Sequence, residues 1–172
     1  MNRLEILVNT LRAGRVRRWH TDDKAPQSVG EHTFGVMCVL LYLLRESGDY
    51  TPENAAEVAA LFVGALCHDT AELFTGDIPA PVRSRLENVA EFAAIDAEAR
   101  GKVFSAQLTS RQRRLVFYAD KLEAMIFAIE SKRFDAAKYN ADLVITAVDG
   151  DAELSPALKN AVRGFFDEQE FL

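Results

Sequence analysis

Apolar residues recur every three or four positions along most of this chain, the spacing that is typical of amphipathic helices. Leu4, Leu7 and Leu11 begin this pattern, and Gly14 marks a plausible end of the first helix. The stretch that follows Ser28 is apolar on more than one face, so we expect a central, heavily buried helix there. The same signals predict further helices from Thr51-Pro52 to about His68, from about Glu87 to Val103, from about Ser110 to Ser131, from about Asp135 to Val148, and from Ser155-Pro156 onward.

The sequence carries no clear strand pattern. No stretch alternates between apolar and polar residues in the way that a half-buried strand would. Internal repeats, low-complexity tracts and long linkers are missing from the sequence as well. The prediction is therefore an all-α fold, a single compact helical domain over residues 1–172.

Two local signals place polar residues at the ends of helices. Ser28-Val29-Gly30-Glu31 has the form of a capping box, in which the first and last side chains bind each other's backbone amides. His32 should therefore lie in the first turns of its helix. The segment Thr75-Gly76-Asp77-Ile78-Pro79-Ala80-Pro81 contains a glycine and two prolines, so we expect a structured loop there.

Composition and charge limit the kind of protein that this can be. Hydrophobic residues make up 49% and charged residues 27%, the balance of a soluble globular protein. The longest apolar run, Val36 to Leu44, is far shorter than the roughly 20 residues that span a bilayer, and the N-terminus opens no signal peptide. A net charge of -6 argues against binding to a nucleic-acid polymer. Cys38 and Cys67 are expected to be buried thiols, so the prediction is a cytoplasmic protein without membrane or nucleic-acid partners.

His68 and Asp69 stand side by side near the middle of the chain, with His32 upstream and Asp120 downstream. The chain has only three histidines, and two of them belong to this set. Imidazole and carboxylate ligands together suit a catalytic divalent metal with open positions for water and substrate. Taken singly, Asp120 is better explained as a surface carboxylate paired with Lys121 or Arg114, and His32 as a satisfied core or capping histidine. Taken together, the four residues favour a metal site and a hydrolytic reaction.

Two acidic residues follow the His-Asp pair. Glu72 lies three residues after Asp69, on the same side of the chain if helical turns persist there. Asp77 lies in the loop that contains Gly76. Two carboxylates in different surroundings could orient an attacking water and protonate a departing oxygen. The alternatives are a solvated glutamate and a turn-forming aspartate, and the turn explains Asp77 equally well.

Arg18-Trp19 is the other informative pair. A guanidinium binds phosphate oxygens at two points, and an indole offers a flat face to a nucleobase. A core tryptophan beside a surface arginine is the alternative. Arg83, Lys121 and Lys24 are further candidates for phosphate contact, although each type of side chain is more often a solvated charge.

The chain resembles the HD-domain metal phosphohydrolases in a series of motifs that occur in the same order, namely Arg18-Trp19, Glu31-His32, His68-Asp69 with Glu72, Thr75-Gly76-Asp77-Ile78-Pro79 and Ala119-Asp120. Within that superfamily it is similar to the small all-helical nucleotide phosphohydrolases that include the bacterial 5'-deoxynucleotidases. Its compact length and residues 16–21 and 26–32 look closer to the phage dATP triphosphohydrolases, the DatZ family. Gly30 and the loop 22–27 depart from the family pattern.

The resemblance implies an activity and a role for single residues. The implied reaction takes dATP, a small-molecule deoxynucleotide, to deoxyadenosine, in a homo-oligomer that acts in the host cytoplasm if a phage encodes it. Zinc, cobalt or manganese would serve as the divalent metal ion. The implied metal ligands are His32, His68, Asp69 and Asp120. Glu72 and Asp77 would act on the attacking water and the leaving group. The implied substrate-binding residues are Arg18, Trp19, Arg83 and Lys121.

Other functions stay open at this point. A 5'-deoxynucleotidase that acts on deoxynucleoside monophosphates is the alternative within the enzymes. A non-catalytic HD-fold protein that only binds nucleotides is another, although Glu72 and Asp77 speak against it because a pure binder needs no proton-transfer groups. A helical interaction protein without any site is the third.

Overall fold

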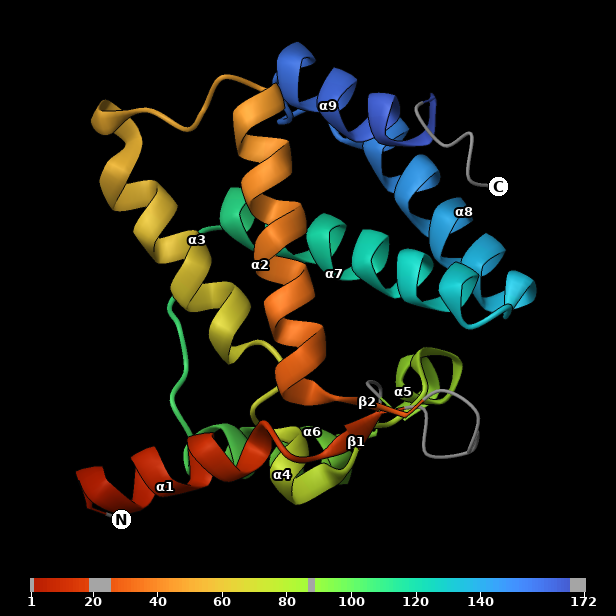
Figure 1. The fold of residues 1–172 in the computed structure, drawn as a ribbon. Coiled ribbons are helices and arrows are strands. Elements are labelled where there is room, and N and C mark those ends of the chain that lie inside the picture. Colours follow the sequence, from red (N-terminus) through yellow and green to blue (C-terminus); the bar gives the residue numbers. More distant parts are fainter. Residues whose placement is uncertain (1, 19–25, 87–88, 168–172) are drawn as a thin grey trace. The chain divides into compact units, whose positions relative to one another are not determined.

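A computed structural model describes residues 2–18, 26–86 and 89–167, and nearly all of its regular structure is helical (Figure 1). The all-α prediction is confirmed. The helices are α1 (Arg3–Ala13), α2 (Val29–Glu46), the short 3-10 helix η1 (Pro52–Asn54), α3 (Ala55–Cys67), α4 (Glu72–Thr75), α5 (Ala80–Leu86), α6 (Ala90–Arg100), α7 (Ser110–Glu130), α8 (Phe134–Gly150) and α9 (Pro156–Asp167).

The chain forms two compact units, which we describe one at a time. Unit 1 comprises Met1–Thr33 and Leu66–Ala106, and unit 2 comprises Phe34–Ala65 and Gln107–Leu172. The chain passes from one unit to the other within α2, within α3 and again between Ala106 and Gln107. That all 172 residues form a single domain stays a prediction.

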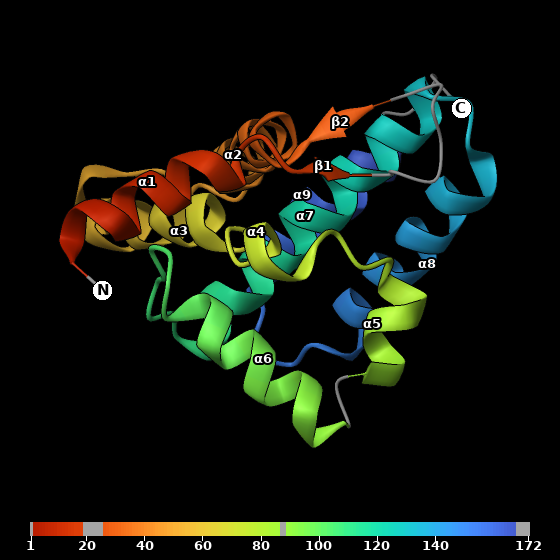
Figure 2. The ribbon, with the colours of Figure 1, turned by 90° about the horizontal axis from the view of Figure 1, so that it is seen from below.

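In unit 1, the short helix α4 lies between α1 and α6 and contacts both (Figure 2). The first of these, α1, begins with a capping box, in which the Glu5 amide donates to Asn2 Oδ1 at 2.9 Å and the Asn2 amide donates to Glu5 Oε2 at 2.7 Å. Its end at Gly14 agrees with the prediction. Because α6 contacts α4, the helix that carries Glu72, α6 lies beside the candidate site.

Unit 1 also contains a strand pair that the sequence pattern did not predict. Strand β1 (Arg17–Arg18) runs antiparallel to β2 (Gln27–Ser28), with Arg17 opposite Ser28 and Arg18 opposite Gln27. Two residues are too few to produce a visible alternation of apolar and polar side chains. The pair matters because it fixes the direction in which Arg18 leaves the backbone.

Backbone contacts join this N-terminal segment to the start of α2. The Val29 amide donates to the carbonyl oxygen of Val16 at 2.8 Å, and the Gly30 amide donates to that of Gly14 at 3.0 Å. A side chain at position 30 would place its Cβ only 3.0 Å from the Gly14 carbonyl oxygen, tighter than ordinary packing allows. Gly30, which departs from the family pattern, therefore permits the close approach of the two segments.

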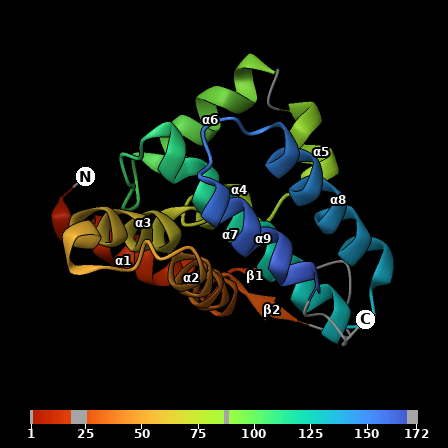
Figure 3. The ribbon, with the colours of Figure 1, turned by 90° about the horizontal axis from the view of Figure 1, so that it is seen from above.

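In unit 2, α7 and α8 lie side by side, and α9 returns beside α8 (Figure 3). The Thr109 and Gln112 side chains form a capping box at the start of α7. The core of unit 2 includes fully or almost fully buried apolar side chains from all three helices, among them Leu115, Leu122, Met125, Val144, Val148, Leu158 and Val162. Burying a side chain of this kind contributes roughly 1.5–3 kcal/mol to folding.

The loop after α4 is shorter than predicted. It covers only residues 76–79, because α5 begins at Ala80 and takes up Pro81 in its first turn, where a missing backbone N–H costs nothing. The next helix, α6, spans Ala90–Arg100 rather than residues 87–103. The prolines in the sequence therefore mark the start of a helix that the prediction missed.

One prediction about burial was wrong. Cys67 is buried as expected, but Cys38 is exposed, and Phe34, one turn earlier on α2, is 66% exposed. The helix α2 is thus not buried on every side. Its apolar composition does not reveal which of its faces meets the core, since an apolar residue on an outer face is common in soluble proteins.

The stretch Pro52–Thr75 is long and apolar enough to cross a membrane by length and composition alone. It is not one uninterrupted helix, because η1, α3 and α4 succeed one another with a turn at residues 68–71, and 39% of its apolar 18-residue window is buried within the protein. Core helices of soluble proteins pass the same test. The expectation of no membrane partner stays a prediction.

Candidate metal centre

The first predicted ligand, His32, lies in the first turn of α2 and is completely buried. The predicted capping box is present there, because the Ser28 amide donates to Glu31 Oε2 at 2.7 Å and the Glu31 amide donates to Ser28 Oγ at 3.1 Å. The box determines where the helix begins. It therefore also determines the direction in which the imidazole of His32 points.

His68 and Asp69 follow directly after α3, which ends at Cys67. Thr70 stabilises this turn, since its hydroxyl oxygen lies 2.9 Å from the carbonyl oxygen of Cys67 and 3.1 Å from that of Phe104. Thr70 is itself buried. The sequence analysis did not identify Thr70, and its local sequence carried no signal, because its second partner lies 34 residues away.

Three ligand atoms of unit 1 form a tight triangle. The Nε2 atoms of His32 and His68 are 3.2 Å apart, and Asp69 Oδ2 lies 3.5 Å from the former and 3.2 Å from the latter. These three residues are also the group of described residues that could jointly hold a metal ion. The sequence thus led to three residues that the fold brings together from two separate segments.

The size of the triangle fits a metal ion. Zinc binds imidazole nitrogen and carboxylate oxygen at about 2.0–2.2 Å, so two such atoms on one tetrahedral ion lie roughly 3.3–3.6 Å apart. The three observed separations, 3.2, 3.2 and 3.5 Å, are close to that range. A mixed set of imidazoles and one carboxylate also accepts cobalt and manganese.

The fourth predicted ligand, Asp120, lies on α7 in unit 2. Its Oδ2 accepts a hydrogen bond from Lys121 Nζ at 2.7 Å, and Lys121 Nζ also lies 5.8 Å from the centre of the Phe117 ring. The pairing of Asp120 with Lys121 is one of the two alternatives that the sequence analysis named, the other being Arg114. Metal binding by Asp120 and phosphate binding by Lys121 stay predictions.

Arg18 extends from β1 to the metal ligands. Its Nη1 donates to Asp69 Oδ2 at 3.1 Å, the same oxygen that faces the two histidines. Both side chains are largely buried, which strengthens the attraction between their charges. The predicted substrate-binding arginine therefore touches a predicted metal ligand. Trp19, its neighbour in the chain, lies outside the described residues, as does Lys24.

Glu72 begins α4 and is only 6% exposed. Burial raises the pKa of Glu72 to about 9, the negative charges of Asp69 and Asp77 act in the same direction, and the positive charges of Arg18 and Arg83 oppose them. No hydrogen-bond donor among the described residues reaches Glu72 Oε2. In the metal-free protein this raised pKa favours the protonated carboxyl group at neutral pH, and Oε2 is a buried oxygen.

Asp77 follows a glycine that the fold requires. Gly76 ends α4 with φ 71°, a conformation that residues with a side chain rarely adopt, and its amide donates to the Glu72 carbonyl oxygen at 2.8 Å. This turn places the half-buried Asp77 close enough to raise the pKa of Glu72. Both predicted proton-transfer residues thus lie in one electrostatic environment.

Arg83 extends from α5 and also acts on Glu72 through its charge. Its Nη2 donates to Asp96 Oδ1 at 3.1 Å, and its guanidinium carbon lies 5.9 Å from the centre of the Phe92 ring. The sequence analysis did not identify Asp96 or Phe92, because nothing in the local sequence connects α6 with Arg83.

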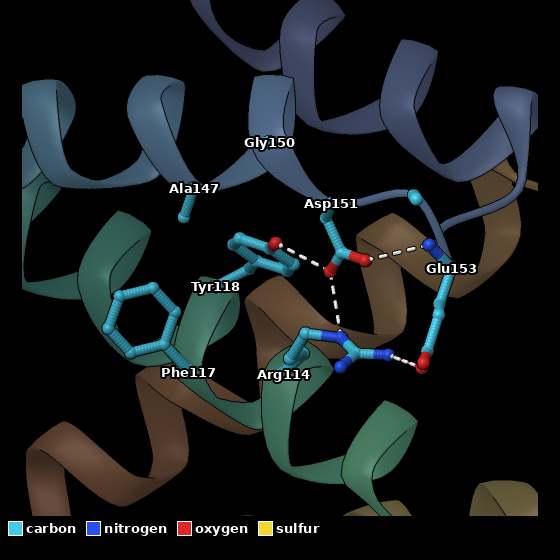
Figure 4. Close-up of a pocket in the computed structure, with 8 residues that line it drawn as sticks. Arg114, Phe117, Tyr118, Ala147, Gly150, Asp151 and Glu153 are labelled. Carbon is cyan, nitrogen blue, oxygen red and sulfur yellow. Dashed lines mark hydrogen bonds and ion pairs between the residues drawn. The ribbon is translucent and has the colours of Figure 1, made fainter.

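A cavity of about 470 Å³ lies in unit 2 and is lined by residues of α7, α8 and the connection from α8 to α9 (Figure 4). The Tyr118 hydroxyl donates to Asp151 Oδ2 at 3.1 Å, and Arg114 Nε lies 2.7 Å from the same oxygen and pairs with Glu153 as well. The polar groups of this cavity are bound to one another. They join α7 to the connection between α8 and α9, and the cavity contains none of the predicted site residues.

Comparison with known proteins places the chain in a family. The sequence profile of the family described as 5'-deoxynucleotidase YfbR-like matches residues 7–106, more than half of the chain. The chain therefore belongs to the YfbR-like family of HD phosphohydrolases. The matched residues include the triangle of ligands, Arg18, Glu72 and Asp77.

Two phage proteins are similar in sequence. A dATP triphosphohydrolase of Acinetobacter phage SH-Ab 15497 is 35% identical over 102 residues, which are 56% of this chain and 50% of that protein. A dATP triphosphohydrolase of Salmonella phage PMBT28 is 32% identical over 133 residues, 70% of this chain and 64% of that protein. The chain thus spans between half and two thirds of the length of these relatives.

A solved structure shares the fold. It is the HD phosphohydrolase DatZ of cyanophage S-2L, bound to dA and one catalytic zinc ion, and it superposes with a TM-score of 0.68 over 93% of each chain. The sequence identity is 21%. This likeness confirms the predicted HD-domain fold.

Proposed function

We propose that this protein is a metal-dependent deoxynucleotide phosphohydrolase that takes dATP to deoxyadenosine. The observation that carries the proposal is the triangle of His32, His68 and Asp69 ligand atoms, whose separations fit a divalent ion, beside the buried carboxyl group of Glu72. The two phage relatives that are dATP triphosphohydrolases support this choice of substrate.

In the proposed site, His32, His68, Asp69 and Asp120 hold zinc, cobalt or manganese. A divalent ion there supplies a Lewis acid for the phosphoryl group and an acidified water. The DatZ structure with its catalytic zinc supports this assignment. Asp120→Asn tests the fourth ligand, with a clear drop in metal affinity expected in calorimetry and no drop expected for Lys121→Gln.

Glu72 and Asp77 provide for proton transfer. Hydrolysis forms a bond between phosphorus and the water oxygen, breaks the bond to the departing oxygen, and moves one proton from the former to the latter. Glu72, whose pKa is raised by burial, donates a proton to the departing oxygen. Asp77, from the same environment, accepts a hydrogen bond from the attacking water and orients it.

Two arginines of unit 1 are suited to the phosphates. Arg18 and Arg83 both lie close enough to Glu72 to influence its pKa, so their positive charges surround the carboxyl group. A guanidinium binds phosphate oxygens at two points. In this proposal Trp19 contacts the deoxynucleoside and Lys121 adds a further charge for the phosphates.

A substrate panel tests the proposal. The purified protein, loaded in turn with zinc, cobalt and manganese, is incubated with deoxynucleoside mono-, di- and triphosphates, and the products are separated by chromatography with and without a chelator. We expect dATP to be consumed and deoxyadenosine to appear, with no turnover in the chelated sample. Turnover of no nucleotide with any of the three metals would refute the proposal.

A 5'-deoxynucleotidase is the second candidate, because the matching family carries that description. The same panel distinguishes the two. Faster consumption of dAMP than of dATP would favour the nucleotidase, whereas the reverse order favours the triphosphohydrolase.

A protein that only binds nucleotides is separated from an enzyme by Glu72→Gln. This variant keeps the shape of the side chain and removes the titrating proton, so an enzyme would lose turnover while it still binds metal and nucleotide. An unchanged rate would exclude Glu72 from the reaction. A homo-oligomeric state, a cytoplasmic location and the absence of a nucleic-acid partner stay predictions, and gel filtration with light scattering tests the first.

A further inference from the structure

Arg83 is held by one face of α6. Phe92, Asp96 and Arg100 lie four residues apart on that helix, so their side chains share one face. Asp96 Oδ1 accepts from Arg83 Nη2 at 3.1 Å, and the Phe92 ring lies beneath the guanidinium, 5.9 Å from its central carbon. The face thus offers Arg83 both a negative charge and an aromatic surface.

Asp96 is itself fixed in place. Its second oxygen, Oδ2, accepts from Arg100 Nε at 2.7 Å, so each carboxylate oxygen has its own guanidinium. The Asp96 side chain is 19% exposed and that of Arg83 is 28% exposed, whereas that of Arg100 is 44% exposed. The contact with Arg83 is therefore the more sheltered of the two, and Arg100 holds the carboxylate from the solvent side.

Arg83 has further N–H groups besides the one that binds Asp96. An arginine carries five N–H groups, and among the described residues Asp96 is the one acceptor that Arg83 reaches through a hydrogen bond. The Arg83 charge also acts on Glu72. Because α6 contacts α4, the helix that begins at Glu72, Asp96 lies on a helix that packs beside the candidate site.

From these contacts we infer that Asp96 is a positioning residue, which orders the Arg83 guanidinium so that its remaining N–H groups receive the phosphates of the substrate. The inference rests on the proposed function, in which Arg83 contacts phosphate. Holding a long side chain in one conformation before the substrate arrives removes an ordering cost from binding. Asp96 touches neither substrate nor metal in this arrangement and acts through Arg83 alone.

The test is a double-mutant cycle of Asp96→Asn and Arg83→Gln with dATP as substrate. Ordering one long side chain costs roughly 0.5–1.5 kcal/mol, so Asp96→Asn alone is expected to raise KM about two- to tenfold with little change in kcat. In the Arg83→Gln background the same Asp96→Asn substitution should raise KM no further, because the residue through which it acts is gone. Full additivity of the two effects would overturn the inference.

Matched controls separate positioning from stability. Glu98→Gln on the same helix removes a carboxylate that pairs with Lys102 and should leave KM unchanged. Arg100→Gln loosens Asp96 without touching Arg83 and should raise KM less than Asp96→Asn does. If Asp96→Asn fails to fold in thermal unfolding, Arg100→Gln supplies the test, and an unchanged KM for it would then count against the inference.

A binding measurement distinguishes this inference from the proposed function. Inorganic tripolyphosphate is titrated into the wild-type protein and the variants by calorimetry, which requires no turnover. Weaker binding to Asp96→Asn than to Glu98→Gln supports the inference even if no nucleotide is hydrolysed. Turnover of dATP by the wild type, with equal KM and equal tripolyphosphate binding for Asp96→Asn, would overturn the inference and leave the proposed function intact.

Discussion

The imidazole Nε2 atoms of His32 and His68 lie 3.2 Å apart, although 36 residues separate them in the chain. One of them follows a helix cap at the start of α2, and the other follows the end of α3. Two neutral imidazoles at this distance share at most one hydrogen, whereas a cation between them would be bound by both. The arrangement is therefore better suited to a metal ion than to a hydrogen bond alone.

Replacement of a buried ligand should abolish metal binding. His32→Gln removes an imidazole from the triangle while it keeps a polar side chain, and we expect metal affinity to fall by more than the 10- to 100-fold that is typical of residues around the ligands. Calorimetry and metal analysis after gel filtration measure it. Cys38→Ser, at an exposed position of the same helix, serves as the control and should bind metal as the wild type does. Equal metal content in both variants would contradict the assignment.

Arg18 should influence both the metal and the substrate. It donates to Asp69 Oδ2, so Arg18→Lys, which cannot form a two-point contact, is expected to weaken metal binding and to lower kcat/KM by roughly 10- to 100-fold. Arg17→Lys changes the exposed neighbour on the same strand and should have little effect. The two variants are compared in metal titration and in steady-state kinetics, and equal behaviour would show that the ion pair with Asp69 has no function.

The stability of the metal-free protein should depend on pH through Glu72. The folded chain keeps the Glu72 proton up to about pH 9, whereas an ordinary glutamate loses it near pH 4.5. Between these values the folded state binds more protons than the unfolded state, so the free energy of unfolding should decrease as the pH rises. Urea unfolding at several pH values in this window measures the slope. Glu72→Gln should flatten it, while Glu98→Gln should leave it unchanged.

The turn at Gly76 should matter for activity as well as for stability. Gly76→Ala forces a side chain into an extended conformation with positive φ (φ 71°, ψ 166°) that is essentially restricted to glycine, at a cost of roughly 1–3 kcal/mol, and displaces Asp77. Gly48→Ala is the matched control, because Gly48 has a similar φ of 76° but belongs to unit 2, far along the chain from the site residues. We expect similar losses in the free energy of unfolding and a loss of kcat only for Gly76→Ala.

The network in unit 2 should contribute to stability. Tyr118 is buried and its hydroxyl donates to Asp151, and burial, together with this bond, raises the pKa of Tyr118. Tyr118→Phe removes the bond and should lower the free energy of unfolding by about 1 kcal/mol. Tyr139→Phe, at an exposed position on α8, should change it little. Equal stability of the two variants would contradict the structural role.

The apolar periodicity was sufficient to predict most helices, and the capping box at Ser28 and Glu31 was sufficient to place His32. These features depend on residues within a few positions of one another, so the local sequence contains them. The exposure of Cys38 was not predictable in this way, because it depends on which face of α2 meets other helices.

For the candidate site too, local sequence features were predictable and tertiary contacts were not. The residues that would touch metal or phosphate were identified by type and order, as His68 and Asp69 illustrate. The contacts that hold these residues in place were not identified from the sequence. The contact between Asp96 and Arg83 spans 13 residues and two helices, and that between Arg18 and Asp69 spans 51 residues. Such pairs are produced by tertiary packing, and no local pattern reveals them.

Main-chain hydrogen bonds join the segment 14–18 to residues 27–30 at the start of α2. The alignment of Arg18 therefore depends little on which side chains occupy positions 15–17, provided that Gly30 allows the close approach. Most side chains of this segment can therefore be substituted without a change in the position of the Arg18 guanidinium. An identity of only 32–35% to the phage relatives is thus compatible with an unaltered placement of the arginine.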